Sequence, residues 1–217
     1  MNTMLKGSTT ADGRGPHPGK RRRAPGRRKR WARGLLLVAS LLLVTARAVR
    51  ADDVAVPLPM QAKLLATVAD YDKGFAERAK GKVKIALLTS KSPESARAAT
   101  QMQGVLKGLP TIGGLPHEES VVRFESGAAL ANLCRTDGIS IVFLMPGFGS
   151  EIGDIKKSLD GVSTLSVASV GSYVEQGIVL GFDVISGKPK LLVNLPQSRA
   201  QKIAFKAELL KMVKVIE

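Results

Sequence analysis

Apolar side chains recur at helical spacing in residues 60–79, where the regular patterning of the chain begins. Leu64, Val68, Tyr71 and Phe75 fall on one side of a helix drawn through this stretch, and lysines and acids lie elsewhere on its surface. The spacing predicts one amphipathic helix over residues 60–79.

From residue 83 onward, short apolar runs alternate with amphipathic segments. Ser92, Pro93 and Glu94 mark the start of one helix, because serine caps a helix, proline fits its first position and an acid favours its first turn. The predicted strands cover residues 83–89, 120–125, 139–145 and 162–168, and the predicted helices cover residues 92–107, 127–135 and 150–159. Such alternation predicts parallel strands with helices on both faces of the sheet.

The C-terminal part of the chain predicts a hairpin and a last helix. Two apolar runs, residues 178–185 and 190–195, flank Ser186-Gly187-Lys188-Pro189, which is a turn sequence. Residues 197–215 are expected to form the helix, with Ile203, Ala207, Leu210 and Val213 on its apolar face. Lys202 and the other basic residues of this region predict a solvated helix face. The fold class that follows is α/β: a single-domain three-layer sandwich over residues 52–217, with a mostly parallel central sheet and a C-terminal antiparallel hairpin.

The positive charge of the chain is concentrated in residues 1–51. The whole chain has a formal net charge of +15, yet residues 52–217 hold 20 basic and 17 acidic residues, a net charge of +3. The apolar stretch at residues 34–45 follows the basic run and is shorter than the roughly 20 residues of a membrane span. Small-residue patterns ending at Ala48 and Ala51 come next. This order is typical of a secretory signal peptide with a long basic n-region.

We expect cleavage after Ala51, with Ala48 as the second choice, and therefore a periplasmic protein without a stable membrane span. An uncleaved membrane anchor stays open as an alternative. A basic arm that binds nucleic acid is disfavoured, because the apolar stretch would have no use in it.

Candidate catalytic and metal-binding groups are few. His117 lies in a Gly/Pro-flanked stretch and is expected to be a solvated loop residue, since a zinc site needs three or four protein ligands. Cys134, the single cysteine, is expected to be a small buried side chain on a helix, although a disulfide between two chains, and hence a homodimer, stays open. No serine, histidine and acid pattern for nucleophilic catalysis is present.

A glycine-rich segment follows the strand predicted at residues 139–145. Gly147, Gly149 and Gly153 are spaced so that backbone amides could approach a pyrophosphate at the start of a helix. Pro146 intervenes, however, and no first βα unit of a dinucleotide fold begins here. We therefore expect a tight turn with Ser150 as the helix cap, and no cofactor.

Residues 161–213 carry the marks of a known family. Gly177, Gly181 and Phe182 belong to the first strand of the hairpin, Asn194 precedes Leu195 at the end of the second, and Leu209-Leu210 closes the last helix. In these features, and in the order of elements over residues 57–217, the chain resembles the YfiR-like periplasmic family. The matching residues are expected to be structural: the glycines permit close backbone approach, and Asn194 can cap the helix that follows it.

The resemblance implies a periplasmic α/β domain without enzymatic activity or cofactors. Relatives bind the periplasmic sensor domain of an inner-membrane diguanylate cyclase and repress it, which lowers cyclic-di-GMP and biofilm formation. The sequence departs from them in having one cysteine, which excludes redox control by an intrachain disulfide, and in lacking an aromatic start at Val56-Pro57-Leu58-Pro59.

The leading hypothesis is an exported regulator that binds an envelope protein, an inner-membrane signalling protein of the diguanylate cyclase or histidine kinase type. The alternative is a periplasmic solute-binding component of a transport system, because a mixed α/β sheet offers crevices at its strand ends. An enzyme would require a catalytic site that the sequence does not contain.

Overall fold

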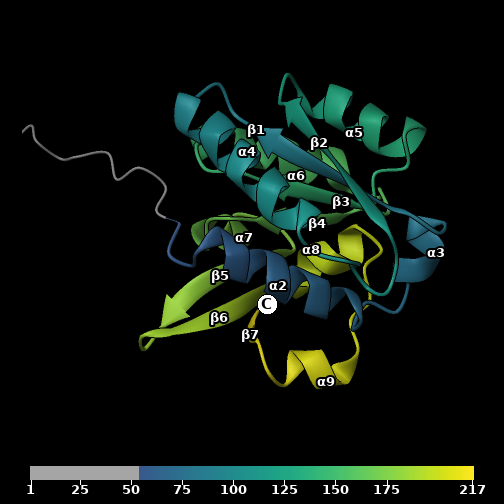
Figure 1. Cartoon of the computed structure of the whole chain (residues 1–217), viewed down its shortest axis with the longest axis vertical. Helices are drawn as coiled ribbons and strands as arrows, with labels where there is room; N and C mark the ends of the chain where they lie inside the picture. The colour runs from purple at the N-terminus through teal and green to yellow at the C-terminus, as the bar shows by residue number, and fades with distance from the viewer. Residues whose placement is uncertain (1–53) are drawn as a thin grey trace, which may run out of the picture. The chain divides into compact units, whose positions relative to one another are not determined.

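Seven strands form one sheet in the computed structural model, which describes residues 54–217 (Figure 1). Their order is β2-β1-β3-β4-β5-β6-β7. The strands are β1 (Val83–Thr89), β2 (His117–Arg123), β3 (Ile141–Leu144), β4 (Leu165–Ala168), β5 (Leu180–Ile185), β6 (Lys188–Asn194) and β7 (Lys214–Ile216). The expected signal peptide, residues 1–51, lies outside the described residues.

The helices are α2 (Leu58–Ala69), α3 (Phe75–Ala79), α4 (Pro93–Lys107), α5 (Gly127–Thr136), α6 (Ile152–Leu159), α7 (Ser172–Glu175), α8 (Leu195–Ala200) and α9 (Ala207–Leu210). A short 3₁₀ turn, η1 (Gly149–Glu151), leads into α6.

The sheet is parallel from β2 to β5, as the alternation of strands and helices predicts. β5 and β6 pair antiparallel around the turn at Ser186 and Gly187, and β7 then pairs parallel to β6. Ser186 and Gly187 have φ angles of +53° and +73°, which suit the tight turn of a two-residue hairpin. The predicted α/β class and its C-terminal hairpin are confirmed.

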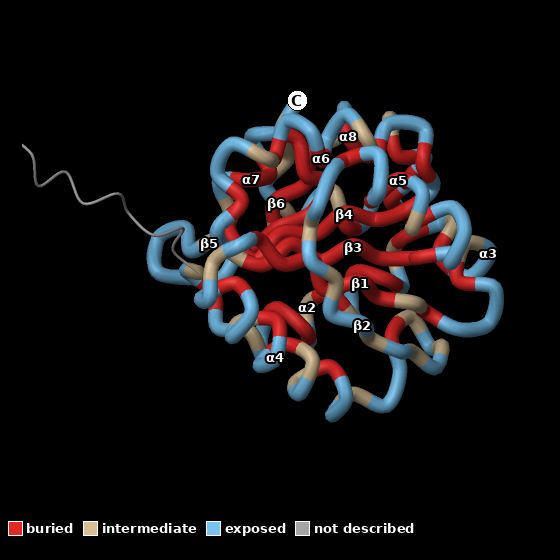
Figure 2. The backbone as a smooth tube through the Cα atoms, turned by 90° about the horizontal axis from the view of Figure 1, so that it is seen from above, coloured by how far each residue is buried: buried red, intermediate tan, exposed pale blue. Residues whose placement is uncertain are grey.

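Two hydrophobic cores lie on opposite faces of the sheet and make the three layers. On one face, α2 and α4 pack on alternate residues of the central strands, including Ile85, Phe143 and Val167. On the other face, α5 and α6 cover the intervening residues, including Leu88 and Leu144. The central strands are therefore buried along both faces, and the exposed backbone lies mainly around them (Figure 2).

Start signals in the sequence place two elements correctly. The strand predicted at residues 83–89 is β1, and the helix predicted to follow Ser92 is α4. The Ser92 hydroxyl accepts a hydrogen bond of 3.1 Å from the backbone N–H of Ser95, as an N-cap should.

The single helix predicted over residues 60–79 is wrong, because α2 ends at Ala69 and α3 starts at Phe75. The connecting residues pair with a distant segment instead of continuing the helix. Lys73 donates to the Ala204 carbonyl at 2.9 Å, and Lys206 donates to the Tyr71 carbonyl at 2.8 Å. In a continuous helix these backbone N–H and C=O groups would instead form intrahelical hydrogen bonds.

The last helix predicted over residues 197–215 is also wrong. α8 ends at Ala200, and Lys202 then adopts a left-handed φ of +57°, which a helix cannot continue through. The chain passes through the segment paired with residues 71–73, forms the short α9 and ends in β7. The apolar spacing in this region is satisfied by three short elements in place of one helix.

Candidate functional site

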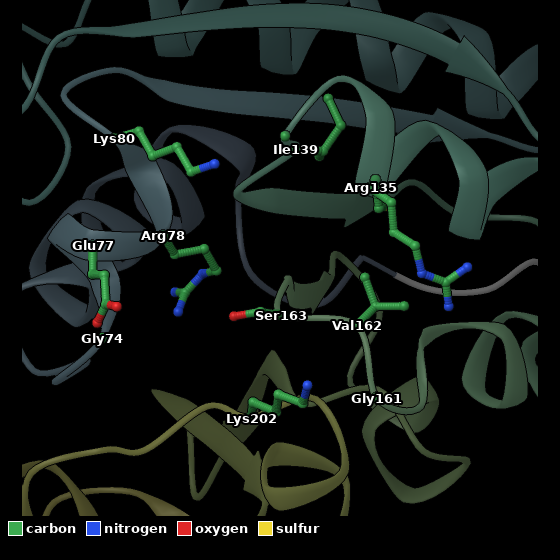
Figure 3. A pocket seen from close by; sticks show the side chains of 12 residues that line it. Gly74, Glu77, Arg78, Lys80, Arg135, Ile139, Gly161, Val162, Ser163 and Lys202 are labelled. Carbon is green, nitrogen blue, oxygen red and sulfur yellow. The ribbon is translucent and has the colours of Figure 1, made fainter.

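A cavity of about 590 Å³ lies at the amino ends of β1, β3 and β4 (Figure 3). The segments just before these strands line it, together with the residues that follow α8. Its lining consists of Gly74, Glu77, Arg78, Lys80, Cys134, Arg135, Gly138, Ile139, Gly161, Val162, Ser163 and Lys202. The volume lies within the roughly 300–1,000 Å³ of small-molecule sites.

Arg78 is the buried cation of the cavity, with a side chain that is 5% exposed. It forms an ion pair with Asp72, and its guanidinium carbon lies 5.6 Å from the centre of the Phe75 ring. Asp72 also accepts from the Gly74 N–H at 3.1 Å, so the carboxylate contacts both the start of α3 and, through Arg78, its last turn. The Nε atom of Arg78 is buried and has no hydrogen-bond partner among the described residues.

Two lysines enter the cavity from the ends of helices. Lys80 follows α3 and Lys202 follows α8, and both have left-handed backbones with φ of +49° and +57°. In Figure 3 the Lys80 amine extends into the open space at the centre of the view and the Lys202 amine lies below Ser163 and Val162, whereas Arg135 extends away from this space. Among the lining residues Glu77 is the acid, so the cavity carries more positive than negative side chains.

Cys134 lies in the cavity wall, on α5, and is buried as predicted. Burial raises the pKa of its thiol to about 11, against an ordinary value of 9.0, and a hydrogen bond with Thr164 and the charge of Arg135 only partly oppose this. At neutral pH the side chain is therefore a protonated thiol, which is a poor nucleophile.

In folds of this kind, ligands usually bind in a crevice at the carboxyl ends of the parallel strands, which is the end opposite to this cavity. The strand order reverses between β1 and β3, and here Gly147 packs so closely that an added Cβ would lie 2.7 Å from Ser90 Oγ. The Tyr173 hydroxyl accepts hydrogen bonds of 3.0 Å from the N–H groups of Gly147 and Phe148. The amides that would bind a pyrophosphate thus already have a partner.

The glycine-rich turn also differs from the prediction in its cap. Ser150 lies inside the 3₁₀ turn η1, and its hydroxyl is 3.4 Å from the Glu151 carboxylate. The predicted N-cap role of Ser150 is wrong, because the 3₁₀ turn leads into α6 without a side-chain cap.

His117 was expected in a solvated loop, and this expectation is wrong. The residue starts β2, and its side chain is 6% exposed. One ring nitrogen, Nδ1, is paired with Glu119, and the other, Nε2, donates to the Leu109 carbonyl at 3.0 Å. Within residues 54–217, no three histidine, cysteine or acidic side chains gather as metal ligands would.

The family-motif glycines lie on either side of the entry to β5. Gly177 has a φ of +114°, and a Cβ there would lie 2.5 Å from Cδ of Lys156. At Gly181 in β5, a Cβ would collide with the Val174 side chain. Phe182, next in the strand, is fully buried and stacks on Phe143 with ring centroids 6.2 Å apart.

The remaining motif residues secure the elements after the hairpin. Asn194 accepts from the Gln197 N–H at 2.9 Å as the cap of α8, and its side-chain amide donates to the Val174 carbonyl at 2.8 Å. Leu209 is buried in the core, and Leu210 packs against it from a half-buried position. These six residues therefore lie around β5, β6 and α9, apart from the lining of the cavity.

Sequence reasoning did not find Arg78 or Lys80, and it placed Lys202 on a solvated helix face. No local sequence pattern predicts that these residues lie at one cavity, because the position of each depends on where a helix ends in the fold. In the described part of the chain, no helix has the length and apolar character needed to cross a membrane.

Comparisons with solved structures identify the fold. The ABC domain in complex with L-Trp from Streptococcus pneumoniae superposes with a TM-score of 0.51 at 15% identity, covering 74% of this chain and 60% of that one. A conserved domain protein from Vibrio cholerae O1 biovar El Tor gives the same TM-score at 14% identity and the same two coverages. The chain thus spans less than two thirds of either structure, and identities of this size show the fold alone.

Sequence comparisons identify the family. No curated protein matches the sequence. The family model described as YfiR/HmsC-like matches residues 60–214, which is most of the chain and takes in every strand of the sheet except the last residues of β7. The chain belongs to the YfiR/HmsC-like family.

Proposed function

We propose that this chain is an exported, non-enzymatic regulator that binds the periplasmic part of an inner-membrane signalling protein. The observation that carries the proposal is the family match over residues 60–214, since YfiR/HmsC-like proteins are periplasmic regulators of diguanylate cyclases. A diguanylate cyclase is accordingly the first candidate partner, and a histidine kinase is the second.

The chemistry of the described residues supports binding over catalysis. The 590 Å³ cavity contains no histidine and one carboxylate, Glu77, so it offers neither a histidine base nor a pair of carboxylates. Its thiol, Cys134, is protonated at neutral pH because burial raises its pKa to about 11. The glycine-rich turn at the other edge has its amides bound to Tyr173.

Regulation by such a protein requires only unequal affinity for two states of its partner. If the regulator binds the inactive cyclase more tightly than the active one, it draws the population toward the inactive state. About 1.4 kcal/mol of difference in binding free energy changes the ratio of the two states about tenfold. The regulator then lowers cyclic-di-GMP without chemistry of its own.

The N-terminal residues 1–51, which are rich in basic residues, suit this role because they resemble an export signal. Their order of charged run, apolar stretch and small-residue sites is that of a cleaved leader. Removal after Ala51 would leave residues 52–217, with a net charge of +3, in the compartment where the sensor domain of a membrane cyclase lies.

Deleting the gene tests the proposal, with cellular cyclic-di-GMP as the measured quantity. A repressor predicts a higher level in the deletion strain and a return to the original level when the gene is restored. An unchanged level in the deletion strain contradicts the cyclase as partner.

A solute-binding component of a transport system is the second candidate function. The cavity favours it, because its volume suits a small ligand. A fold neighbour was solved in complex with L-Trp, but at 15% identity that likeness extends to the fold only. Loss of uptake of a solute on deletion, with cyclic-di-GMP unchanged, would favour this function over the first.

A further inference from the structure

We infer that the cavity at the amino ends of β1, β3 and β4 binds a small organic anion through Arg78, Lys80 and Lys202. The ligand class is a carboxylate- or phosphate-bearing molecule of metabolite size. The inference does not rest on the proposed regulation, because a ligand could modulate a regulator or be the cargo of a solute binder.

The first observation is the unpartnered nitrogen of Arg78. The side chain is 5% exposed, and Asp72 together with the Phe75 ring fixes its guanidinium in place. Yet Nε is buried without a hydrogen-bond partner among the described residues. Asp72 therefore leaves part of the hydrogen-bonding capacity of the guanidinium unused, and an anion in the cavity would pair with its charge.

The second observation is the charge around this nitrogen. Asp72 neutralises the charge of Arg78. The excess positive charge of the lining therefore comes from Lys80, Arg135 and Lys202, which outnumber the acid Glu77. Neither Lys80 nor Lys202 has an ion pair or side-chain hydrogen bond within residues 54–217. Their ammonium groups are therefore available to an anion held at Arg78.

Helix ends alone do not explain this arrangement. Cations at helix C-termini complement the partial negative charge there, and this accounts for exposed lysines after α3 and α8. It gives no reason for a buried arginine whose Nε lacks an acceptor. The left-handed backbones of Lys80 and Lys202 also carry a steric cost that asparagine or glycine would reduce.

The size of the cavity points to an organic ligand. Its volume of about 590 Å³ exceeds what a single inorganic anion needs, and Ile139 and Val162 lie in its wall. Ser163 adds a hydroxyl beside Arg78 in Figure 3, which can donate to a second oxygen of the same group. The lining is thus mainly polar and cationic, which suits a ligand whose recognised part is an anionic group.

Isothermal titration calorimetry on protein purified after expression of the full chain tests the inference. The probes are succinate, inorganic phosphate and neutral succinamide, at constant ionic strength set with sodium chloride. We expect saturable binding of succinate or phosphate, and the better of the two identifies the anionic group. If neither anion binds at concentrations up to about 10 mM, the inference is overturned. A Kd weaker than this corresponds to a binding free energy of less than about 3 kcal/mol.

A charge-neutral double variant, Lys80→Asn with Lys202→Asn, locates the site. Asparagine tolerates the left-handed backbone, so the variant should fold normally. We expect affinity for the anion to fall about tenfold, the loss of two exposed charge contacts. Lys91→Asn with Lys107→Asn removes two exposed lysines elsewhere and should leave affinity within about twofold.

Two further outcomes would overturn the inference. Equal losses in the two double variants would mean that the anion responds to overall charge, and equal binding of succinamide would mean that charge is not recognised. Arg78→Gln should weaken binding as well, but its ion pair with Asp72 also stabilises the fold. If that variant does not fold, the lysine pair still decides the question.

Discussion

Gly181 allows β5 and the preceding helix α7 to approach more closely than a side chain would permit. An alanine Cβ at this position would collide with the Val174 side chain, which is itself fully buried and cannot easily move. Overpacking of a core typically costs about 1–3 kcal/mol. We therefore expect Gly181 of the family motif to act through packing.

We expect Gly181→Ala to lower the free energy of unfolding by about 1–3 kcal/mol in urea titrations. Gly153→Ala in α6 is the matched control, because no atom lies within 4 Å of an added Cβ there. That control should be neutral or stabilising by up to about 1 kcal/mol. Equal stabilities of the two variants would contradict the close approach at Gly181.

The buried thiol of Cys134 makes stability depend on pH in the alkaline range. Its pKa of about 11 in the fold lies above the ordinary 9.0, so the unfolded chain releases the proton first as pH rises. The contribution of this group is complete below pH 9 and is lost progressively as pH rises toward 11.

Wild-type protein should consequently lose more stability than Cys134→Ala between these pH values, because alanine cannot titrate. Thermal unfolding of both proteins across the range measures the difference, and the subtraction removes the titration of lysines and tyrosines. In the same protein at pH 8, a thiol reagent should react far more slowly than with an unfolded control. Parallel pH profiles or rapid labelling would show that the thiol is accessible.

At the scale of elements, Asn194 joins the hairpin to the helices on either side of it. Its side-chain oxygen caps α8, and its side-chain nitrogen bonds the Val174 carbonyl at the end of α7. The residue is 8% exposed, so water does not readily replace either bond.

Replacing Asn194 by alanine removes both bonds, and we expect a loss of about 2–4 kcal/mol in the free energy of unfolding. Asn194→Ser keeps a capping oxygen but loses the bond to Val174. Its free energy of unfolding should therefore lie between those of the wild type and Asn194→Ala. Denaturant titrations give the order. If serine were as destabilising as alanine, the cap would contribute little and the bond to Val174 nearly everything.

Elements with local start signals were predictable from the sequence, and those fixed by distant pairing were not. Ser92 and the apolar run after residue 82 specify α4 and β1 by themselves. The break between α2 and α3 and the break after α8 depend on each other, because residues 71–73 pair with residues 204–206. Helical periodicity on both sides gives no sign of that contact.

The same distinction separates the predictable parts of the candidate site from the others. Cys134 could be assigned to a buried helix face from its neighbours in sequence. The grouping of Arg78, Lys80 and Lys202 could not, since it arises where α3 and α8 end at one edge of the sheet. Burial of His117 likewise follows from β2 starting earlier than its sequence suggests.

For the whole molecule, the carboxyl and amino ends of the parallel strands differ in structure. The edge where the strand order reverses is packed by Gly147 and Tyr173, whereas the opposite edge holds the cationic cavity. Most of the positive charge of the chain is in the sequence of residues 1–51. We propose that charge serves export in that part of the sequence and recognition of an anionic ligand in the cavity.

Cellular cyclic-di-GMP in a deletion strain, complemented in two ways, tests the proposed role most directly. One strain expresses the full chain, and the other expresses residues 52–217 without the leader, at matched protein levels. We predict that deletion raises cyclic-di-GMP, that the full chain restores the low level, and that the leaderless chain does not. An unchanged level on deletion, or restoration by the leaderless chain, would contradict an exported repressor of a membrane diguanylate cyclase.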